Sequence, residues 1–234
     1  MERRPPEHDR IDDLVAESSP APYRRGDLPL ALTLVVAWPV AGREGPGGPD
    51  RGRIMDARRV VTGHDAGGRA VFVGDEPVPA VEVSLMPGME FHRIWGADSA
   101  PTFPDDGSRP DAVAYFPPLG GFRFGFFTIP PDSRGGPPAD IDIRRAFEEL
   151  EQKLPGLAAH AERDHPGMHT TATIDYGVVL SGQATLELDD GAKVTLSAGD
   201  TYVQNGTRHR WSNPGEVPAV LALTLIGTVH RKVG

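Results

Sequence analysis

The chain has 234 residues, a formal net charge of −9 and no cysteine. An acidic chain is a poor candidate for binding nucleic acid or an anionic membrane surface, and a chain without cysteine has no disulfide, zinc–thiolate site or thiol nucleophile. Its 28 glycines and 24 prolines are many for a globular chain and favour a turn-rich β protein with some loose segments. This length fits one domain with appendages or a short pair of domains.

Residues 1–54 are predicted to form an N-terminal extension that is rich in Pro, Gly and Arg and partly disordered. Residues 28–40 within it are apolar, but a bilayer-spanning helix needs about 20 residues. Asp27 just before this run and the prolines inside it argue against a signal peptide. We therefore interpret the run as an edge strand or a strap on the fold and expect a cytoplasmic protein. Because the fold should begin near Met55, deleting the extension should leave the melting temperature unchanged.

Residues 55–139 carry short strand-like runs that are separated by turns and loops. The strongest is 121–129 (GFRFGFFTI), in which alternation puts Phe122, Phe124 and Phe126 on one face of a strand. We expect these N-terminal strands to complete or extend a barrel formed by the C-terminal part of the chain. The other strand-like runs are 58–62, 70–73, 81–85 and 91–96, the last of which contains His92.

Residues 140–161 contain the one strong helix pattern, DIDIRRAFEELEQK. Asp140 or Asp142 can cap its first turn by accepting a hydrogen bond from a backbone N–H group. Pro155 follows the pattern and ends it. Apolar residues recur every three or four positions, as in a helix that packs across a barrel or against a dimer partner. These apolar residues are Ile143, Phe147, Leu150 and Leu154.

Residues 162–234 show short β patterns at even spacing, each ended by a turn that contains glycine. The Asp190-Gly191 turn is of the Asp-Gly type, which supplies the positive φ that a tight hairpin needs. Further turns lie at 198–200 and 205–206. The pattern predicts an all-β fold, with an antiparallel barrel or double-sheet jelly roll as its core.

Two motifs in this segment resemble those of the cupin superfamily. The second cupin motif, G-x5-P-x-G-x2-H-x3-N, is matched at Gly206, His209 and Asn213. Gln204 stands in place of its proline, and its leading glycine, Gly199, comes one residue late. The motif match covers roughly the last third of the chain, and for this second motif it is fairly specific.

The first cupin motif, G-x5-H-x-H-x3,4-E-x6-G, is degenerate in this chain. Gly182 matches its last position, and His169 takes the place of the first histidine. Asp175 replaces the glutamate, and Thr171 replaces the second histidine. The departure at Thr171 matters because threonine is a poor ligand for a transition metal.

The resemblance implies a site inside the barrel, where imidazoles and a carboxylate hold one divalent metal ion. By position, His169, Asp175 and His209 would be both the metal ligands and the catalytic residues. Two histidines and one carboxylate can form the facial triad of non-haem iron sites, and the metal could be Fe, Zn, Mn or Ni. The residues alone leave two other interpretations open. The histidines could move protons or bind substrate without a metal, or they could be hydrogen-bonded core residues.

Five further residues are candidates for contacting a substrate. Trp211 lies two residues past His209 and so shares its face of a strand, whereas Tyr176 points away from the face of Asp175. For both aromatic residues, packing is the alternative. Gln204 could hydrogen-bond a ligand or end a strand. The remaining candidates are Thr171 and His92, the latter without support from a motif.

These features predict a small-molecule enzyme of secondary metabolism with its site in the barrel lumen. Its reaction would be that of a metal-assisted lyase, dehydratase, isomerase or cyclase acting on an oxygenated metabolite. A non-haem iron dioxygenase and a non-catalytic cupin that binds a small ligand are the alternatives. The family resemblance also implies a homodimer. We expect no nucleic-acid or membrane partner.

Overall fold

The computed structural model describes residues 54–162 and 164–231, which belong to the compact unit Pro49–Gly234. The predictions for the extension, including its apolar run 28–40, lie outside the described residues. The elements are β1 (Ala57–His64), β2 (Ala70–Val78), β3 (Glu90–Ala97), β4 (Phe122–Ile129), η1 (Asp132–Arg134), α2 (Ile143–Lys153), η2 (Ala158–His160), β5 (Thr173–Ser181), β6 (Gln183–Glu187), η3 (Asp189–Gly191), β7 (Lys193–Ser197), β8 (Thr201–Asn205), β9 (Arg210–Ser212) and β10 (Ala219–Gly227).

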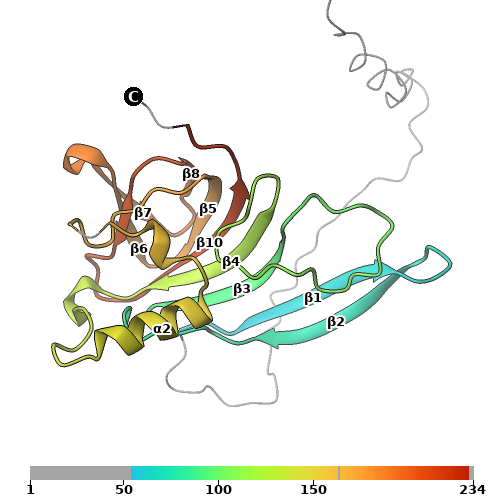
Figure 1. Cartoon of the computed structure of the whole chain (residues 1–234), viewed down its shortest axis with the longest axis horizontal. Helices are drawn as coiled ribbons and strands as arrows, with labels where there is room; N and C mark the ends of the chain where they lie inside the picture. Colours follow the sequence, from blue (N-terminus) through green and yellow to red (C-terminus); the bar gives the residue numbers. More distant parts are fainter. Residues whose placement is uncertain (1–53, 163, 232–234) are drawn as a thin grey trace, which may run out of the picture. The chain divides into compact units, whose positions relative to one another are not determined.

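Two antiparallel sheets enclose one apolar interior (Figure 1). The larger sheet has the strand order β3-β4-β10-β5-β8, and the smaller has the order β7-β6-β9. Buried residues from both sheets, such as Val179, Ala184 and Leu221, form a single core cluster. The predicted all-β antiparallel barrel is therefore confirmed. Strands β3 and β4 lie in the same sheet as β5, β8 and β10, so the barrel is built from both halves of the described chain.

Strand β10 lies at the centre of the larger sheet and explains how the site is framed. It pairs with β4 on one side and with β5 on the other. Its sequence is a nearly continuous apolar run rather than an alternating one, and its first four residues are all buried. On β5 the residues do alternate: Thr173, Asp175 and Val179 are buried, whereas Tyr176 is exposed. The pleat of β5 thus turns the Asp175 carboxylate inward.

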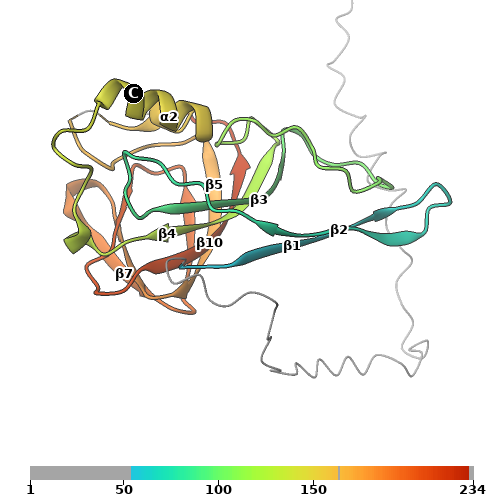
Figure 2. The ribbon, with the colours of Figure 1, turned by 90° about the horizontal axis from the view of Figure 1, so that it is seen from below.

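Strands β1 and β2 form a separate antiparallel hairpin. Figure 2 shows it running past β3 and extending beyond the barrel. Its base packs through Ala57 and Val78 against Ile94 and Phe126, on the face of the larger sheet that points away from the barrel interior. The expected strand over 81–85 is wrong: only Val81 makes a β-bridge, with Phe91, and the chain then turns. Turn hydrogen bonds from Met86 to Val83 and from Met89 to Met86 replace strand pairing there, and the flanking prolines at 79 and 87 cannot donate to a strand ladder.

Helix α2 begins at Ile143, after Asp142 caps it by accepting a hydrogen bond from the Arg145 backbone N–H at 3.2 Å. Its buried stripe consists of Ala146, Leu150 and the following Leu154. Ile143 and Phe147, which were expected on the same face, lie one step around the helix and are exposed. None of the described helices is long and apolar enough to cross a membrane.

Ion pairs and hydrogen bonds tie α2 to the loop that precedes β3. The Ser84 backbone N–H donates to the Glu149 carboxylate at 2.9 Å. Lys153 Nζ donates to the Glu82 carbonyl oxygen at 2.8 Å and pairs with Glu149 at 2.6 Å. Helix and loop therefore form one cover, which lies beside the barrel strands in both views (Figures 1 and 2).

Candidate active site

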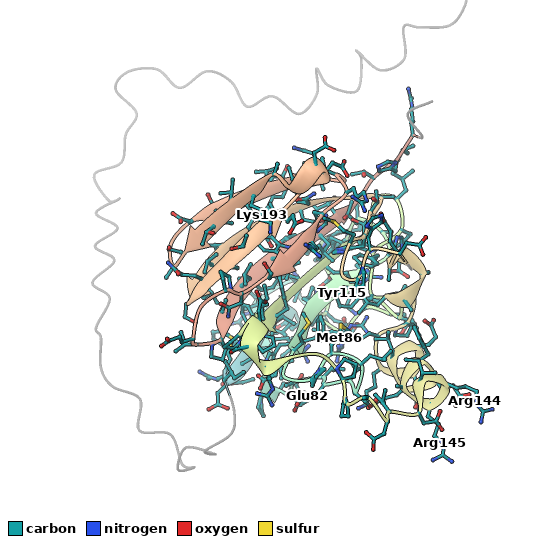
Figure 3. The ribbon with its side chains drawn as sticks, turned by 90° about the vertical axis from the view of Figure 1, so that its left-hand side faces the viewer. Glu82, Met86, Tyr115, Arg144, Arg145 and Lys193 are labelled. Carbon is teal, nitrogen blue, oxygen red and sulfur yellow. The ribbon has the colours of Figure 1, made fainter. Side chains whose placement is uncertain are left out.

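The barrel interior contains a cavity of about 260 Å³. Its walls are the inner faces of the sheets on one side and the α2 cover with the loop before β4 on the other. In Figure 3, Met86 and Tyr115 lie in the interior, whereas Arg144 and Arg145 lie at the periphery. Among the described residues, no lysine or arginine lines the cavity. The lining residues are Met86, Met89, Phe91, Tyr115, Phe116, Phe127, Leu150, Leu157, Ala158, Ala161, Gly167, Met168, His169, Asp175, Tyr202, His209, Trp211, Leu223 and Leu225.

Asp175 is the one carboxylate in this lining. On β5 it lies opposite Leu225 of β10 and Gln204 of β8, and it is 6% exposed. Its Oδ1 atom is buried and has no hydrogen-bond partner among the described residues. Burial raises the pKa of Asp175 to about 6, and a hydrogen bond from the Thr173 side chain acts in the opposite direction. A carboxyl group in this state changes its protonation near neutral pH.

His169 and His209 lie side by side in the same cavity. Their backbones form a β-bridge with two N–H to O hydrogen bonds of 3.0 Å, and their ring centroids are 4.2 Å apart. His169 Nδ1 lies 3.0 Å from the Gly167 carbonyl oxygen, and His209 Nδ1 lies 2.8 Å from that of Thr207. Because a carbonyl only accepts, both Nδ1 atoms carry the proton. Each Nε2 atom is left with a free lone pair.

The electrostatics of the cavity reverse the usual order of proton affinities. Burial, and secondarily the charge of His169, lowers the pKa of His209 to about 4. Burial likewise lowers the pKa of His169. Between about pH 4 and pH 6, therefore, Asp175 holds its proton while His209 has lost its own. Over this interval the cavity thus combines a carboxyl group that retains a proton with a neutral His209 imidazole.

Two tyrosines in the lining were not predicted as site residues. Tyr202 lies across β5 at Gly177, where a Cβ atom would come within 2.4 Å of the tyrosine hydroxyl oxygen. Tyr115 reaches the cavity from the loop before β4, edge-on to Phe91 with ring centroids 5.8 Å apart. Burial and the charge of Asp175 raise the pKa of both phenols. A glycine within a strand is a sequence signal for such a close approach, but nothing in the sequence indicated Tyr115.

Of the five predicted substrate-contacting residues, Trp211 lines the cavity and packs against Tyr202 with ring centroids 4.8 Å apart. The other four do not line it. Thr171 is hydrogen-bonded to Thr173 at 2.8 Å, and Gln204 donates to the Thr207 carbonyl oxygen at 3.0 Å. Both side chains therefore make local hydrogen bonds to residues two or three positions away.

Tyr176 and His92 lie on the outer face of the larger sheet. Tyr176 is exposed because its neighbour on β5, Asp175, takes the inward direction. His92 is buried under the β1–β2 hairpin, where its Nδ1 atom donates to the Val78 carbonyl oxygen at 3.0 Å. It borders a surface groove beside β1 and β2 instead of the barrel cavity. Neither side chain can reach a molecule bound beside Asp175.

The donor set does not fit the three-ligand metal site that the motifs implied. The Nε2 atoms of His169 and His209 are free to bind a metal, and their Nδ1 hydrogen bonds are of the kind that orients histidine ligands. Within the described part of the chain, however, no group of three His, Cys, Asp or Glu side chains is placed to hold an ion. Asp175 lines the same cavity without completing such a group, and Thr171 faces Thr173.

Arg208, in the turn before β9, links that turn to the segment that carries His169. Arg208 Nε and Nη2 donate to the two oxygens of Glu162 at 2.7 Å each, and Nη1 donates to Asp189 at 2.8 Å. This bidentate contact joins the segments on either side of the His169–His209 bridge. It therefore fixes the register at which the two imidazoles meet.

A sequence profile of the cupin domain matches residues 157–226. Phomopsin biosynthesis cluster protein C' of Diaporthe leptostromiformis is 32% identical, over 68% of this chain and 72% of its own length. The cupin-domain-containing oxidoreductase fogC of Aspergillus ruber is 25% identical, over 72% of this chain and 71% of its own length. Among solved structures, the cupin domain of Schizosaccharomyces pombe Cnp3 aligns with a TM-score of 0.38 and 10% identity, over 73% of this chain and 87% of that one.

Proposed function

The chain belongs to the cupin superfamily, and from that premise we propose that it is an enzyme of small-molecule biosynthesis that binds its substrate in the barrel cavity. The proposed chemistry is a proton transfer on an oxygenated metabolite, as in an isomerase, dehydratase or lyase. The names of relatives, which refer to biosynthesis clusters, support the pathway class. The reaction class rests on the residues of the cavity.

The proposal depends on one observation, the buried and unpartnered Oδ1 atom of Asp175. A carboxylate with an unpartnered, buried Oδ1 atom costs folding free energy. Such a cost is commonly kept where the group has a chemical task. A catalytic acid or base works best when its pKa is near the operating pH, and burial brings the pKa of Asp175 to about 6. As the one carboxylate in a mainly apolar lining, it is the group best suited to remove a proton from bound substrate.

The proposed step is proton abstraction next to a carbonyl group. The Asp175 carboxylate takes the proton from carbon, the C–H electron pair forms a carbon–carbon double bond, and the carbonyl π pair moves onto oxygen as an enolate. Returning the proton to the same carbon gives exchange, and returning it to another carbon gives an isomer. His169 and His209, which are neutral and have free Nε2 atoms, can accept a proton or a hydrogen bond from a substrate hydroxyl.

Deuterium exchange tests this proposal without knowledge of the natural substrate. Uncharged ketones and aldehydes that carry alkyl chains or one aromatic ring are incubated in D2O with the full-length protein. Mass spectrometry then measures deuterium at the carbon beside the carbonyl. We expect exchange with wild type and its loss in Asp175→Asn. The matched control is Asp190→Asn, an exposed turn residue of η3. No exchange across the panel with wild type would refute the proposal for this substrate class.

Chelator treatment in the same exchange assay tests whether the reaction needs the metal that the family implies. Because the reaction is proposed for protein groups alone, wild type treated with a chelator should keep its exchange activity. Loss of exchange on chelation, with recovery on adding one divalent metal, would instead restore the metal-assisted reaction predicted from the motifs. Elemental analysis of wild type and His209→Ala gives the same comparison without an assay.

An oxidation is the second candidate function, because several relatives are named cupin-domain-containing oxidoreductases. The two free Nε2 atoms of His169 and His209 are compatible with it. Dioxygen uptake by protein loaded with ferrous iron, offered the same panel, is the test. Uptake that His209→Ala abolishes would favour a non-haem iron dioxygenase, and no uptake would retire it for these substrates.

Two further predictions remain to be tested. A non-catalytic binding cupin would bind members of the panel tightly, give no exchange, and keep its affinity when the side chains of His169 and His209 are removed. The homodimer implied by the family is tested by light scattering on the full-length protein during size-exclusion chromatography.

A further inference from the structure

We propose that Tyr202 and Tyr115 form the oxygen-binding pocket of this site, where their hydroxyls donate hydrogen bonds to the carbonyl or enolate oxygen of an uncharged, mainly apolar substrate beside Asp175. This inference rests on the proposed function, since it assigns the groups that would hold the substrate oxygen during proton transfer. It adds a substrate class and two residues that the motifs do not contain.

Tyr202 owes its position to a glycine on the neighbouring strand. It stands on β8 opposite Gly177 of β5, and a Cβ atom built on Gly177 would meet the Tyr202 ring carbons Cζ and Cε1 at 2.3 and 2.4 Å. Gly177 follows Asp175 by two residues, so both face the barrel interior. The hydroxyl end of the phenol ring therefore lies against β5, two residues along the strand from Asp175. Trp211 packs against the ring, with the two planes tilted by 60°.

Tyr115 approaches the same carboxylate from the loop before β4. Its backbone N–H donates to the Pro155 carbonyl oxygen at 2.8 Å, which fastens it to the end of the α2 segment. Arg93 and Arg123 donate to the carbonyl oxygens of residues 112–114, directly before it. The charge of Asp175 acts on Tyr115 and on Tyr202 alike. The two phenols thus come from different walls and line the same cavity as the Asp175 carboxylate.

Neither phenol hydroxyl has a hydrogen-bond partner within the described part of the chain. Tyrosine hydroxyls that are buried usually find such a partner. Both residues line the cavity, so the partner that satisfies them would be a bound molecule. Hydrogen-bond donors that are held in place at an apolar site are suited to stabilise the negative charge that develops on an enolate oxygen. A phenol beside a carboxyl group of raised pKa is a known arrangement for this task.

The lining also sets the charge of the substrate. The guanidinium groups of Arg93 and Arg123 bind backbone carbonyls and Asp98 and do not line the cavity. A carboxylate or phosphate substrate would therefore enter an apolar cavity with no cation to pair with, at a large desolvation cost. An uncharged ketone or aldehyde pays no such cost. Its apolar part would contact Met86, Leu150 and Leu223.

Binding of a ketone and its matched hydrocarbon tests the inference. The probes are 4-fluoroacetophenone, whose oxygen only accepts hydrogen bonds, and 1-ethyl-4-fluorobenzene, which lacks it. Fluorine NMR titration measures both affinities, and infrared spectroscopy measures the carbonyl stretch of the bound ketone. We expect wild type to prefer the ketone. Tyr202→Phe should weaken ketone binding about 5-fold, the worth of one net hydrogen bond, and should leave the hydrocarbon unaffected.

Further variants keep the test falsifiable. Tyr202→Phe/Tyr115→Phe should abolish the preference for the ketone and the shift of its carbonyl stretch to lower frequency. Gly177→Ala should weaken ketone binding while retaining both hydroxyls, because the added methyl group displaces the Tyr202 ring. Tyr176→Phe, on the outer face of β5, is the matched control and should change nothing. The inference is overturned if the double variant, folded by circular dichroism, still prefers the ketone and still shifts its stretch.

This binding test separates the inference from the proposed function. Binding that depends on the tyrosines but gives no deuterium exchange would retain the oxygen pocket and refute the reaction. Exchange that is lost in Asp175→Asn but unchanged in the double tyrosine variant would retain the proposed reaction and refute the oxygen pocket.

Discussion

The two faces of the larger sheet both bury imidazole and carboxyl groups, and they use them differently. On the outer face, His92 and Glu90 are 2% and 5% exposed, with His92 Nε2 3.8 Å from Glu90 Oε2 and His92 Nδ1 donating to Val78. On the inner face, Asp175 points its carboxylate toward the cavity, and the imidazoles of His169 and His209, which form a β-bridge outside the named strands, line the same cavity. Burial and residue type are shared. Free space at the reactive atoms distinguishes a candidate site from a structural pair.

The largest expected effect comes from exchanging carboxylate for amide on each face. Asp175→Asn should reduce the rate of deuterium exchange by about 10²- to 10⁴-fold, because it removes the acid–base group. Glu90→Gln should leave the rate per folded molecule unchanged, since Glu90 does not line the cavity. Exchange rates at equal concentrations of folded protein make the comparison. Equal losses in the two variants would end the distinction between the faces.

The next effect is on stability as a function of pH. Asp175 has a folded pKa of about 6 against its usual 3.8, so its contribution to stability is present at low pH and is lost as the pH rises from about 4 to about 6. His209 has a folded pKa of about 4 against 6.5, so its contribution is present above pH 6.5 and is lost as the pH falls to about 4. Each change amounts to about 3 kcal/mol, and the two oppose each other.

Single variants should therefore tilt the stability curve in opposite directions. Relative to wild type, Asp175→Asn should gain stability as the pH rises from 4 to 6, and His209→Gln should lose stability over the same interval. Urea denaturation at several pH values measures both differences. Parallel curves for wild type and both variants would mean that neither group is perturbed by its burial.

The outer face should respond in stability alone. His92→Leu removes the hydrogen bond to the Val78 carbonyl oxygen, which should cost about 1–3 kcal/mol of unfolding free energy. Binding of 4-fluoroacetophenone should be unchanged in the folded variant. A change in ketone affinity as large as that of Tyr202→Phe would place His92 in the site after all.

The smallest effect is expected at the arginine that aligns the imidazole pair. Arg208→Ala removes the contacts to Glu162 and Asp189, which are partly exposed and screened by salt. We expect a slight fall in melting temperature that disappears at high salt, with a modest rise in KM for exchange. An unchanged KM would show that the His169–His209 bridge holds its register without this clamp.

The fold could be predicted from the sequence because its turns are encoded locally. Gly182 and Gly206, the two motif glycines, both adopt positive φ, and a Cβ atom there would approach the backbone oxygens of Pro218 and Thr171 at 2.6 and 3.1 Å. Asn213, also in the motif, is buried and ties the loop after β9 to the Ile129 carbonyl oxygen at 3.0 Å. Each of these positions tolerates essentially one residue type, so it can be recognised in a single sequence.

The candidate site was less predictable, because the cavity depends on which side chains meet across the barrel. Strand alternation was enough to send Asp175 inward and Tyr176 outward. It could not show that Tyr115 would arrive from a loop or that His92 would lie beneath a second hairpin. Motif position likewise suggested Gln204 for ligand contact, whereas the fold uses its amide to close the turn at Thr207. Contacts that loop residues make leave no periodic pattern in the sequence.

The protonation state of Asp175 tests the central claim most directly, because it requires no substrate. Carbon-13 NMR of the full-length protein with labelled aspartate, assigned with Asp175→Asn, follows its carboxyl resonance across the pH range. The account predicts a titration midpoint near pH 6. A midpoint below about 4, the range of an ordinary aspartate, would mean that Asp175 is solvated or paired in solution. It would then contradict its role as the proton-transfer group of this cavity.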